Sequence, residues 1–317
     1  MMSPSRRRVL LRIWFLLSVL LFAATCADRI RPYLKSIAGA KDVPGAHVRS
    51  AEPRSQGVRL ASWNLEFLDV PGRGPDGRSA ADYAALARYV QALNADVIAV
   101  QEVASVEALK LVFSPEVYAY HLAQLGGAQR SGFVYKRELV LTPQPDLREL
   151  SLQGLRAGAD VALRLNGSVV RLLSVHLKAF CVTGSLARDN KDCKKLRAQI
   201  PVLEGWIDAR AREGAPFVVL GDFNRALGEA DDALFRDLDD NDPRGLRLVR
   251  AGSRVHSSCH NKRQLAVDHV LLGGSAGDWL TPTGLSELRY EHDDLAAGLK
   301  LSDHCPIHVT LAPGVLR

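Results

Sequence analysis

The chain has few cysteines, few aromatic residues and no long apolar run. Of its 317 residues, five are cysteine and 6% are aromatic. No two cysteines have the CxxC spacing that is typical of zinc sites, so the sequence gives no support to a zinc protein. It contains no internal repeat and no low-complexity segment, and a wholly disordered chain is excluded. Apolar and charged fractions of 47% and 24% instead predict a large globular core.

Positive charge is concentrated at the N-terminus. The formal net charge is +6, but residues 1–57 contain ten basic and three acidic residues, whereas the remainder contains 31 basic and 32 acidic residues. The part from residue 58 onward is therefore nearly neutral. This argues against a broad footprint on duplex nucleic acid.

Residues 1–27 have the layout of an export signal, in which a basic start precedes an apolar run from Ile13 to Ala24. The run is shorter than the roughly 20 residues that span a bilayer comfortably. A cleaved signal peptide is favoured over an N-terminal membrane anchor, and the start also resembles a bacterial twin-arginine signal or a lipoprotein signal at Cys26. Residues 28–57 show no clear period and are interpreted as a linker. Residues 58–317 are expected to form the domain.

Four cysteines follow Cys26, and they can pair in three ways. Cys181 and Cys193 bracket one polar loop, while Cys259 and Cys305 flank the two C-terminal strands, so these are the expected pairs. Disulfides persist only in oxidising compartments. They agree with an exported protein in the periplasm, the cell envelope or the medium, or one anchored in the inner membrane.

Short apolar runs alternate with helical patterns, which predicts a layered α/β domain. Strands are expected at 58–63, 97–101, 132–135, 160–165, 169–177, 217–221, 266–272 and 307–311. Helices are expected at 80–92, 105–111, 186–212 and 229–237. The Asn166-Gly167 pair between two alternating runs predicts a hairpin turn.

Polar residues stand where the expected strands end, and they include carboxylates, amides and imidazoles. They are Asn64, Glu66, Gln101, Glu102, His176, Asp222, Asn224, Asp268, Ser302, Asp303 and His304. Taken singly, each has an ordinary explanation as a turn residue, a helix cap or a satisfied core histidine. Together they predict that several strand ends converge on one acidic pocket, which is unfavourable unless a cation neutralises it.

The Asp303-His304 pair in a polar turn before an apolar strand is a general-base arrangement. A carboxylate that bonds an imidazole fixes its tautomer and raises its basicity. In-line attack on a phosphodiester needs an activated water, a cation and a donor for the leaving oxygen. Asp222, Glu102 with a metal ion, and the two histidines of the set supply these groups.

In their order along the chain, these motifs resemble the endonuclease/exonuclease/phosphatase superfamily of metal-dependent phosphodiesterases. The resemblance covers about Val58 to Leu311 and runs through WN, QE, a strand with histidine, GDFN, a strand with aspartate, and SDH. It implies a four-layer α/β sandwich of the deoxyribonuclease I type, in which two packed mixed β-sheets are flanked by helices.

The resemblance also implies roles for the residues that match the motifs. Glu102 would be the main ligand of Mg²⁺ or Mn²⁺, with Asn64 and Glu66 near it, because these ions prefer hard oxygen ligands. Asp222 would orient or deprotonate the attacking water. Asn224 would bind a phosphate oxygen.

The histidines take their implied roles from the same resemblance. His304 would contact phosphate or act as a base, held by Asp303 or Asp268, and which carboxylate takes the proton stays open. His176 matches the first histidine of the deoxyribonuclease and sphingomyelinase branches. His269 follows Asp268 in a strand and should therefore point to the opposite face of the sheet.

Three functions are compatible with this site. An exported nuclease that acts on DNA or RNA is favoured. The alternative is a lipid or small-molecule phosphodiesterase or phosphatase of the sphingomyelinase or phosphoinositide type, although no obvious exposed aromatic hairpin would enter a bilayer. A non-catalytic binding module is least expected, because the Glu, GDFN and SDH groups are all present.

Basic residues follow His176 and precede Asp268, and they either rim the pocket or lie on solvated surfaces. The expected partner is a phosphodiester substrate, with nucleic acid favoured and membrane attachment through the N-terminus as an option. We expect no obligate protein partner and a monomer.

Overall fold

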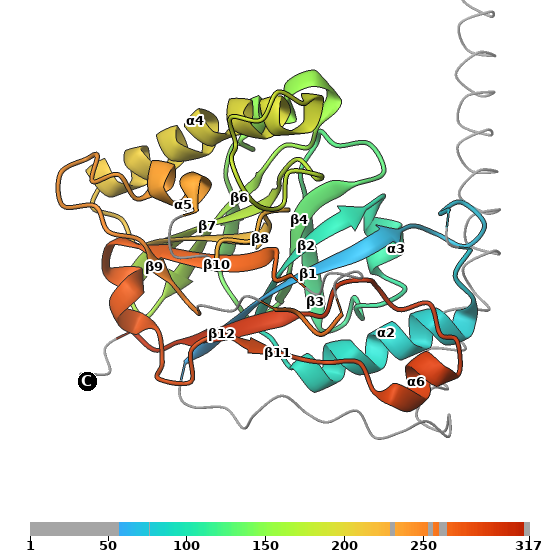
Figure 1. Cartoon of the computed structure of the whole chain (residues 1–317). Coiled ribbons are helices and arrows are strands. Elements are labelled where there is room, and N and C mark those ends of the chain that lie inside the picture. Colours follow the sequence, from blue (N-terminus) through green and yellow to red (C-terminus); the bar gives the residue numbers. More distant parts are fainter. Residues whose placement is uncertain (1–56, 76, 229–231, 253–255, 260–264, 314–317) are drawn as a thin grey trace, which may run out of the picture.

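The computed structural model describes residues 57–75, 77–228, 232–252, 256–259 and 265–313. These residues form two six-stranded β-sheets that pack face to face, with helices on both outer sides (Figure 1). The export signal and almost all of the linker expected from the sequence lie outside the described residues. Within the described ranges, no helix is long and apolar enough to cross a membrane.

The first sheet is mixed, with the strand order β11-β12-β1-β2-β4-β3. Its strands are β1 (Val58–Leu68), β2 (Val97–Val103), β3 (Tyr118–Leu122), β4 (Arg130–Lys136), β11 (Ser286–Glu287) and β12 (Ile307–Leu311). β1 pairs in parallel with β2 and antiparallel with β12. The outer side carries α2 (Ala80–Leu93) and α6 (His292–Ala296), and α3 (Val106–Leu109) follows β2.

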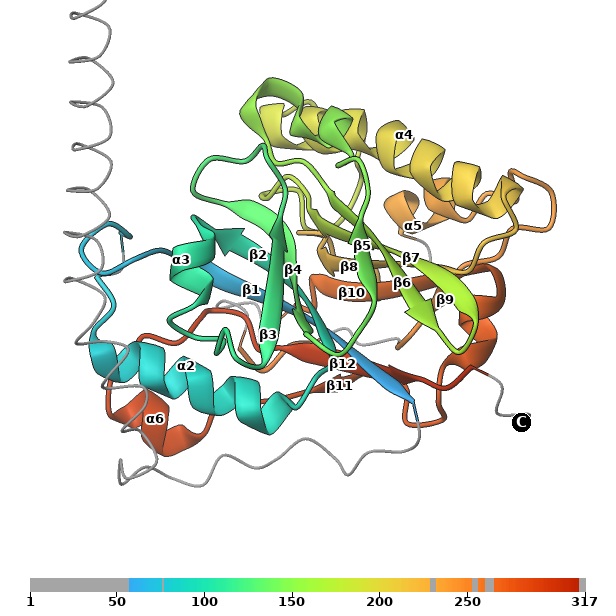
Figure 2. The same cartoon turned by 180° about the vertical axis from the view of Figure 1, so that it is seen from behind.

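The second sheet is also mixed, with the strand order β5-β6-β7-β8-β10-β9. Its strands are β5 (Leu141–Pro143), β6 (Ala159–Leu165), β7 (Ser168–His176), β8 (Phe217–Asp222), β9 (Val249–Arg250) and β10 (Asp268–Gly273). β7 and β8 are parallel, which requires the crossover that contains α4 (Lys191–Arg212). Figure 2 shows α4 and α5 (Ala233–Leu238) covering the outer side of this sheet. The four-layer sandwich expected from the sequence is confirmed.

Side-chain alternation explains why the polar residues gather at one end of the space between the sheets. On β1, Leu60 packs in the apolar core between the sheets, and the same face continues with Ser62 and Asn64. On β8, Leu220 of that core is followed on the same face by Asp222. Strands β2, β7 and β10 repeat the pattern with Gln101, His176 and Asp268. The inter-sheet layer is thus apolar along most of its length and polar at one end.

Local rules account for most element boundaries. The Asn166-Gly167 turn joins β6 to β7, and both residues have positive φ, 47° and 83°, as the predicted hairpin requires. The helix expected at 186–212 begins only at Lys191, because the Asn190 side chain accepts the N–H groups of Asp192 and Cys193 and caps it.

The other predicted elements agree with the structure to different degrees. All eight predicted strands are present, but the sequence did not predict β3, β5, β9 and β11, two of which have only two residues. The helix expected at 229–237 begins at Ala233, where Asp232 caps it, and residues 229–231 lie outside the described residues. The helix expected at 105–111 is shorter, as α3.

Two disulfides join the predicted pairs. Cys181 bonds Cys193 with their Cα atoms 5.1 Å apart, and Cys259 bonds Cys305 with a Cα separation of 5.2 Å. The first fixes the segment after β7 to the start of α4. The second fixes the chain directly after His304.

Candidate active site

Strand register places three of the predicted residues side by side. His176 is the partner of Asp222 across β7 and β8, and Asp268 is the partner of Asp222 across β8 and β10. The close approach of β7 and β8 depends on Gly221, because a Cβ atom there would lie 2.1 Å from the Val175 carbonyl oxygen. The glycine of the GDFN motif therefore lets the strands deliver these side chains together.

Asp222 is the most connected carboxylate of the site, and its side chain is almost fully buried. Asn64 Nδ2 donates to Asp222 Oδ2 at 3.1 Å, and the Asn224 side chain donates to the same oxygen at 3.0 Å. The Nε2 atoms of His176 and His304 lie 3.5 and 3.9 Å from this oxygen. Burial raises the pKa of Asp222 to about 7, although the charge of His304 acts in the opposite direction.

Asn224 holds Asp222 by more than its side chain. Its backbone N–H donates to Asp222 Oδ1 at 2.7 Å, and its Nδ2 also donates to the Leu177 carbonyl at 3.1 Å. Both protons of the Asn224 amide are therefore engaged by the protein, so the structure gives this residue the role of positioning Asp222.

Glu102 reaches the site because β2 is irregular at this point. Gln101 faces the space between the sheets, so a regular strand would turn Glu102 to the other face. The register of β2 instead shifts beside Glu102, whose φ is 57°. Its carboxylate accepts hydrogen bonds from Asn64 Nδ2 and from the Phe67 N–H, both at 3.2 Å. The irregularity thus aims the carboxylate at Asn64.

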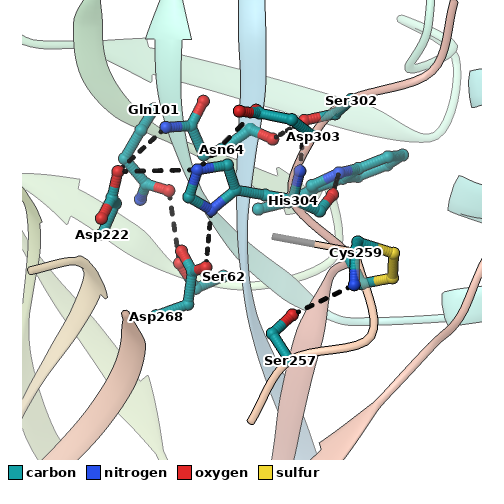
Figure 3. A network of polar contacts seen from close by, with 12 residues as sticks. Ser62, Asn64, Gln101, Asp222, Ser257, Cys259, Asp268, Ser302, Asp303 and His304 are labelled. Atoms are coloured by element: carbon teal, nitrogen blue, oxygen red, sulfur yellow. Dashed lines mark hydrogen bonds and ion pairs between the residues drawn. A yellow bond between two sulfur atoms is a disulfide. The ribbon is translucent and has the colours of Figure 1, made fainter. Parts of the chain in front are cut away.

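His304 is held by Asp268 rather than by its sequence neighbour Asp303. His304 Nδ1 lies 2.7 Å from Asp268 Oδ2, whereas the nearest oxygen of the half-exposed Asp303 is 3.8 Å from Nε2 (Figure 3). Burial alone would lower the pKa of His304, but Asp268, together with the charges of Asp222 and Asp303, outweighs it and raises the pKa to about 10. The imidazole is therefore positively charged at neutral pH.

The backbone around His304 is fixed by the first sheet. Trp63 Nε1 donates to the His304 carbonyl at 3.2 Å, and Tyr290 donates to the same oxygen at 2.5 Å. Ser302 Oγ donates to the Asn64 carbonyl at 2.7 Å. The SDH loop is thus tied directly to the end of β1 that carries Asn64.

Arg156 is a site residue that the sequence did not reveal. Its Nε donates to His176 Nδ1 at 3.2 Å, and its Nη2 donates to the Leu177 carbonyl at 3.2 Å. Burial and the charge of Arg156 lower the pKa of His176 well below its ordinary value, so this ring is neutral. Because Arg156 can only donate, the proton of His176 must be on Nε2, which lies 3.6 Å from Glu102 Oε1. Arg156 belongs to no motif, so no sequence signal pointed to it.

Glu66 lies next to Asp303 in the structure. Its Oε2 accepts the Asp303 N–H at 3.0 Å, and its own N–H donates to Asn64 Oδ1 at 3.0 Å. The Asn64 amide therefore turns its NH₂ group, not its oxygen, toward Glu102 and Asp222. Of the predicted metal ligands, this leaves the carboxylates of Glu102 and Glu66 as the groups that suit a hard cation.

The metal fit depends on how Mg²⁺ usually binds. Among the described residues, no three His, Cys, Asp or Glu side chains form a group that could hold a metal ion. Mg²⁺ is commonly bound by one or two carboxylates together with waters and substrate phosphate oxygens. The partly exposed Glu102 carboxylate fits that mode of binding. The second oxygen of Asp268, Oδ1, is buried and has no hydrogen-bond partner.

Two groups predicted to lie outside the catalytic set can be placed. His269 is buried on the other face of β10, where its Nε2 is 2.8 Å from the Arg225 carbonyl oxygen, as strand alternation predicted. The basic residues after His176 are partly neutralised, because Lys178 pairs with Asp192 at 2.9 Å and Lys194 pairs with Asp189. Arg254, Lys262 and Arg263, which precede Asp268, lie outside the described residues.

Comparison with solved structures defines the fold class. The structure superposes on a humanised D. rerio TDP2 with a TM-score of 0.57 and 17% identity, covering 81% of this chain and 99% of that one. A Neisseria meningitidis 3′-5′ exonuclease gives 0.53 and 17%, with 80% and 100% covered. A Bacteroides thetaiotaomicron mannosyl-6-phosphatase gives 0.51 and 15%, with 80% and 99% covered. At these identities the likeness establishes a deoxyribonuclease I-like fold and no more.

The family follows from the sequence itself. Residues 61–304 match the endonuclease/exonuclease/phosphatase family, and the chain therefore belongs to it. A search of the curated proteins finds no match. The matched span contains all the residues of the candidate site, from Asn64 to His304.

Proposed function

We propose that this protein is a divalent-metal-dependent phosphodiester hydrolase, an exported nuclease that acts on DNA or RNA. The observation that carries the proposal is the convergence of carboxylates, amides and two unlike histidines at one end of the inter-sheet core. Burying carboxylates and imidazoles does not help a hydrophobic core to pack. Clusters of titratable side chains with shifted pKa values are typical of active sites.

Glu102, with Glu66 near it, would hold Mg²⁺ or Mn²⁺. The bound ion would supply a Lewis acid that neutralises charge on the phosphate oxygens in the transition state. Asn64 holds the Glu102 carboxylate through its NH₂ group. The protein thus positions the ligand from β1 while β2 supplies it.

Asp222 is the residue best placed to accept a proton from the attacking water. Asn64 and Asn224 fix its orientation by hydrogen bonds, and both histidines lie within 4 Å of Oδ2. A carboxylate whose pKa lies near 7 is also well matched to general-base work at neutral pH.

The two histidines would serve as donors to phosphate oxygens in different charge states. His304, kept charged by Asp268, would stabilise the negative charge that develops on the phosphate. Neutral His176, whose proton Arg156 confines to Nε2, would donate a hydrogen bond to a phosphate or leaving-group oxygen. Neither histidine then needs to act as the base.

The fold does not identify the substrate, because nucleases and phosphatases share it. A lipid or small-molecule phosphodiesterase or phosphatase is therefore the second candidate. The test is Mg²⁺-dependent release of product from plasmid DNA, RNA, sphingomyelin and an inositol phosphate by the purified protein. Cleavage of DNA or RNA is expected, and cleavage of the lipid alone would contradict the nuclease assignment.

We also propose that the protein is exported and monomeric. The two disulfides support an oxidising compartment, because cytosolic thiols are kept reduced. Free thiols should be titrated in the unfolded, unreduced protein purified from its own cells. We expect no thiol reaction from the four disulfide cysteines, Cys181, Cys193, Cys259 and Cys305. Four reactive thiols in this preparation would contradict export, and size-exclusion chromatography with light scattering tests the monomer.

A further inference from the structure

Among the residues that the structure describes, most aromatic side chains are buried or half-buried. Among the described residues only Phe67 and Phe180 are exposed, to 37% and 78%. A single exposed apolar residue needs no explanation. These two, however, both follow residues of the candidate active site along the chain. Phe67 comes directly after Glu66 in β1, and Phe180 lies in the loop after β7, four residues beyond His176.

Backbone strain marks the same two residues. Eight described non-glycine residues have positive φ, and four of them are asparagines, which tolerate this conformation. The other four are Glu66, Phe67, Glu102 and Phe180. A bulky aromatic residue with φ of 51° or 72° is a genuine outlier, and such strain concentrates at functional sites. Phe67 and Phe180 therefore share an unusual property with two of the predicted metal-site residues.

Phe180 is held rigidly within reach of the site. The Leu177 carbonyl is bonded by Arg156 and Asn224, and Cys181 is bonded to Cys193, so the short segment between them is fixed at both ends. Four residues span no more than about 14 Å, which limits the distance from His176. Lys178 Nζ lies 4.8 Å from the centre of the Phe180 ring. The exposed ring is thus held within about 14 Å of His176, beside a lysine that also pairs with Asp192.

Phe67 is fixed by a different contact. Its N–H donates to Glu102 Oε2 at 3.2 Å, so the ring projects from the residue whose backbone holds the main candidate metal ligand. Any movement of Phe67 would disturb Glu102. The two rings thus stand in two separate segments that adjoin site residues, one near the end of β1 and one in the loop after β7.

We propose that Phe67 and Phe180 are stacking surfaces for the bases that flank the scissile phosphate of a single-stranded nucleic acid. The inference rests on the proposed function and names its substrate class. Aromatic rings beside cations bind single strands in a sequence-tolerant way, because every base has a face that can stack. A base in an intact duplex is already stacked on its neighbours, so a single strand or an unpaired end fits better.

A membrane surface is the competing occupant of exposed apolar residues, and two features argue against it. Insertion into a bilayer needs a contiguous apolar face, whereas here two single rings stand in separate segments, Phe67 in β1 and Phe180 in the loop after β7. Each phenylalanine also contacts a polar residue. The Phe67 N–H donates to Glu102, and Lys178 Nζ lies over the Phe180 ring. Two isolated rings suit two bases better than one lipid surface.

The test compares Phe180→Asn, Phe180→Trp and Phe67→Trp with the wild-type protein on a single-stranded oligonucleotide and on an abasic oligonucleotide of the same length. Asparagine tolerates the left-handed backbone, so Phe180→Asn should keep or raise Tm while it removes the ring. Its kcat/KM for the base-bearing strand should fall about 5- to 150-fold, mainly through KM. Activity on the abasic strand should not change, and both tryptophan variants should retain activity on each strand.

Val169→Ala is the matched control, because Val169 is 44% exposed near the start of β7, far from His176 at its end. It should behave as the wild-type protein. If the wild-type enzyme cleaves oligonucleotides and Phe180→Asn cleaves them equally well, the stacking inference is wrong while the proposed function stands. If the wild-type enzyme cleaves no nucleic acid, the proposed function itself fails. If Phe180→Asn instead loses binding to phosphatidylcholine/phosphatidylserine vesicles, the rings serve a membrane.

Discussion

Arg156 and Asp268 act on the two histidines of the site in opposite directions. Burial and the charge of Arg156, whose Nε donates to His176 Nδ1, keep that ring neutral, whereas Asp268 accepts from His304 Nδ1 and helps to keep that ring charged. Two chemically identical side chains therefore present different donors to the same pocket. Environments that separate the protonation states of paired groups are a common way to divide catalytic work.

Replacing Arg156 tests this division. Arg156→Gln removes the obligatory donor to His176 Nδ1, so the ring gains a second tautomer in which Nε2 carries no proton. We expect kcat to fall about 10- to 100-fold, by analogy with the loss when residues that orient metal-binding histidines are replaced. The ¹⁵N chemical shifts of His176 should show the tautomer mixture. The exposed Arg164→Gln is the control, and a wild-type rate in Arg156→Gln would contradict the role.

At the scale of elements, the loop between β7 and α4 depends on the Cys181–Cys193 disulfide. The bond closes a loop with a sequence separation of 12, and it fixes the segment that carries Phe180. Substitution of both cysteines by alanine should lower the free energy of unfolding by about 3 kcal/mol in the chain-entropy model. Urea unfolding measures this change. Equal stability in the double variant would mean that the loop is held by its other contacts.

The strand β12 makes stability depend on pH through His308. Burial, together with the charge of Arg59, lowers the pKa of His308 to about 4, against about 6.5 in the unfolded chain. As pH falls below about 6.5, the unfolded chain takes up the proton and the folded protein does not, so stability is lost between about pH 6.5 and 4.

The corresponding prediction compares His308→Gln with the wild-type protein. Between pH 7 and pH 5, this histidine should account for about 2 kcal/mol of lost unfolding free energy. The loss measured by urea titration at both pH values should therefore be smaller by about that amount in His308→Gln. Parallel losses in the two proteins would show that His308 has an ordinary pKa.

At the scale of the whole molecule, the sequence predicted the architecture because apolar runs and polar strand ends are local patterns. The polar residues at the strand ends already implied that Asn64, His176, Asp222 and Asp268 converge on one pocket. The sequence also predicted the disulfide pairs. The sequence did not predict the four edge strands β3, β5, β9 and β11. Two of them, β9 and β11, have only two residues and therefore no alternation to detect.

What the sequence could not predict depends on contacts between distant segments. Arg156 meets His176 only through the fold, and the choice of Asp268 over Asp303 as the partner of His304 depends on where β10 lies. The turn of Glu102 toward the site comes from an irregular register, which no alternation pattern contains. Motif order therefore named most residues of the candidate site, whereas Arg156 and the pairing of these residues depend on tertiary packing.

The central claim is that one metal-dependent site hydrolyses phosphodiesters and needs His304. The most direct measurement is the rate of cleavage of a single-stranded oligonucleotide by the wild-type protein and by His304→Ala, with Mg²⁺ and with EDTA. We expect cleavage only with Mg²⁺ and a loss of about 10²- to 10³-fold in His304→Ala, because a donor to the developing charge is removed. His292→Ala, at a histidine with a 93% exposed side chain, should retain the wild-type rate. Equal cleavage by His304→Ala, or cleavage that persists in EDTA, would contradict the account.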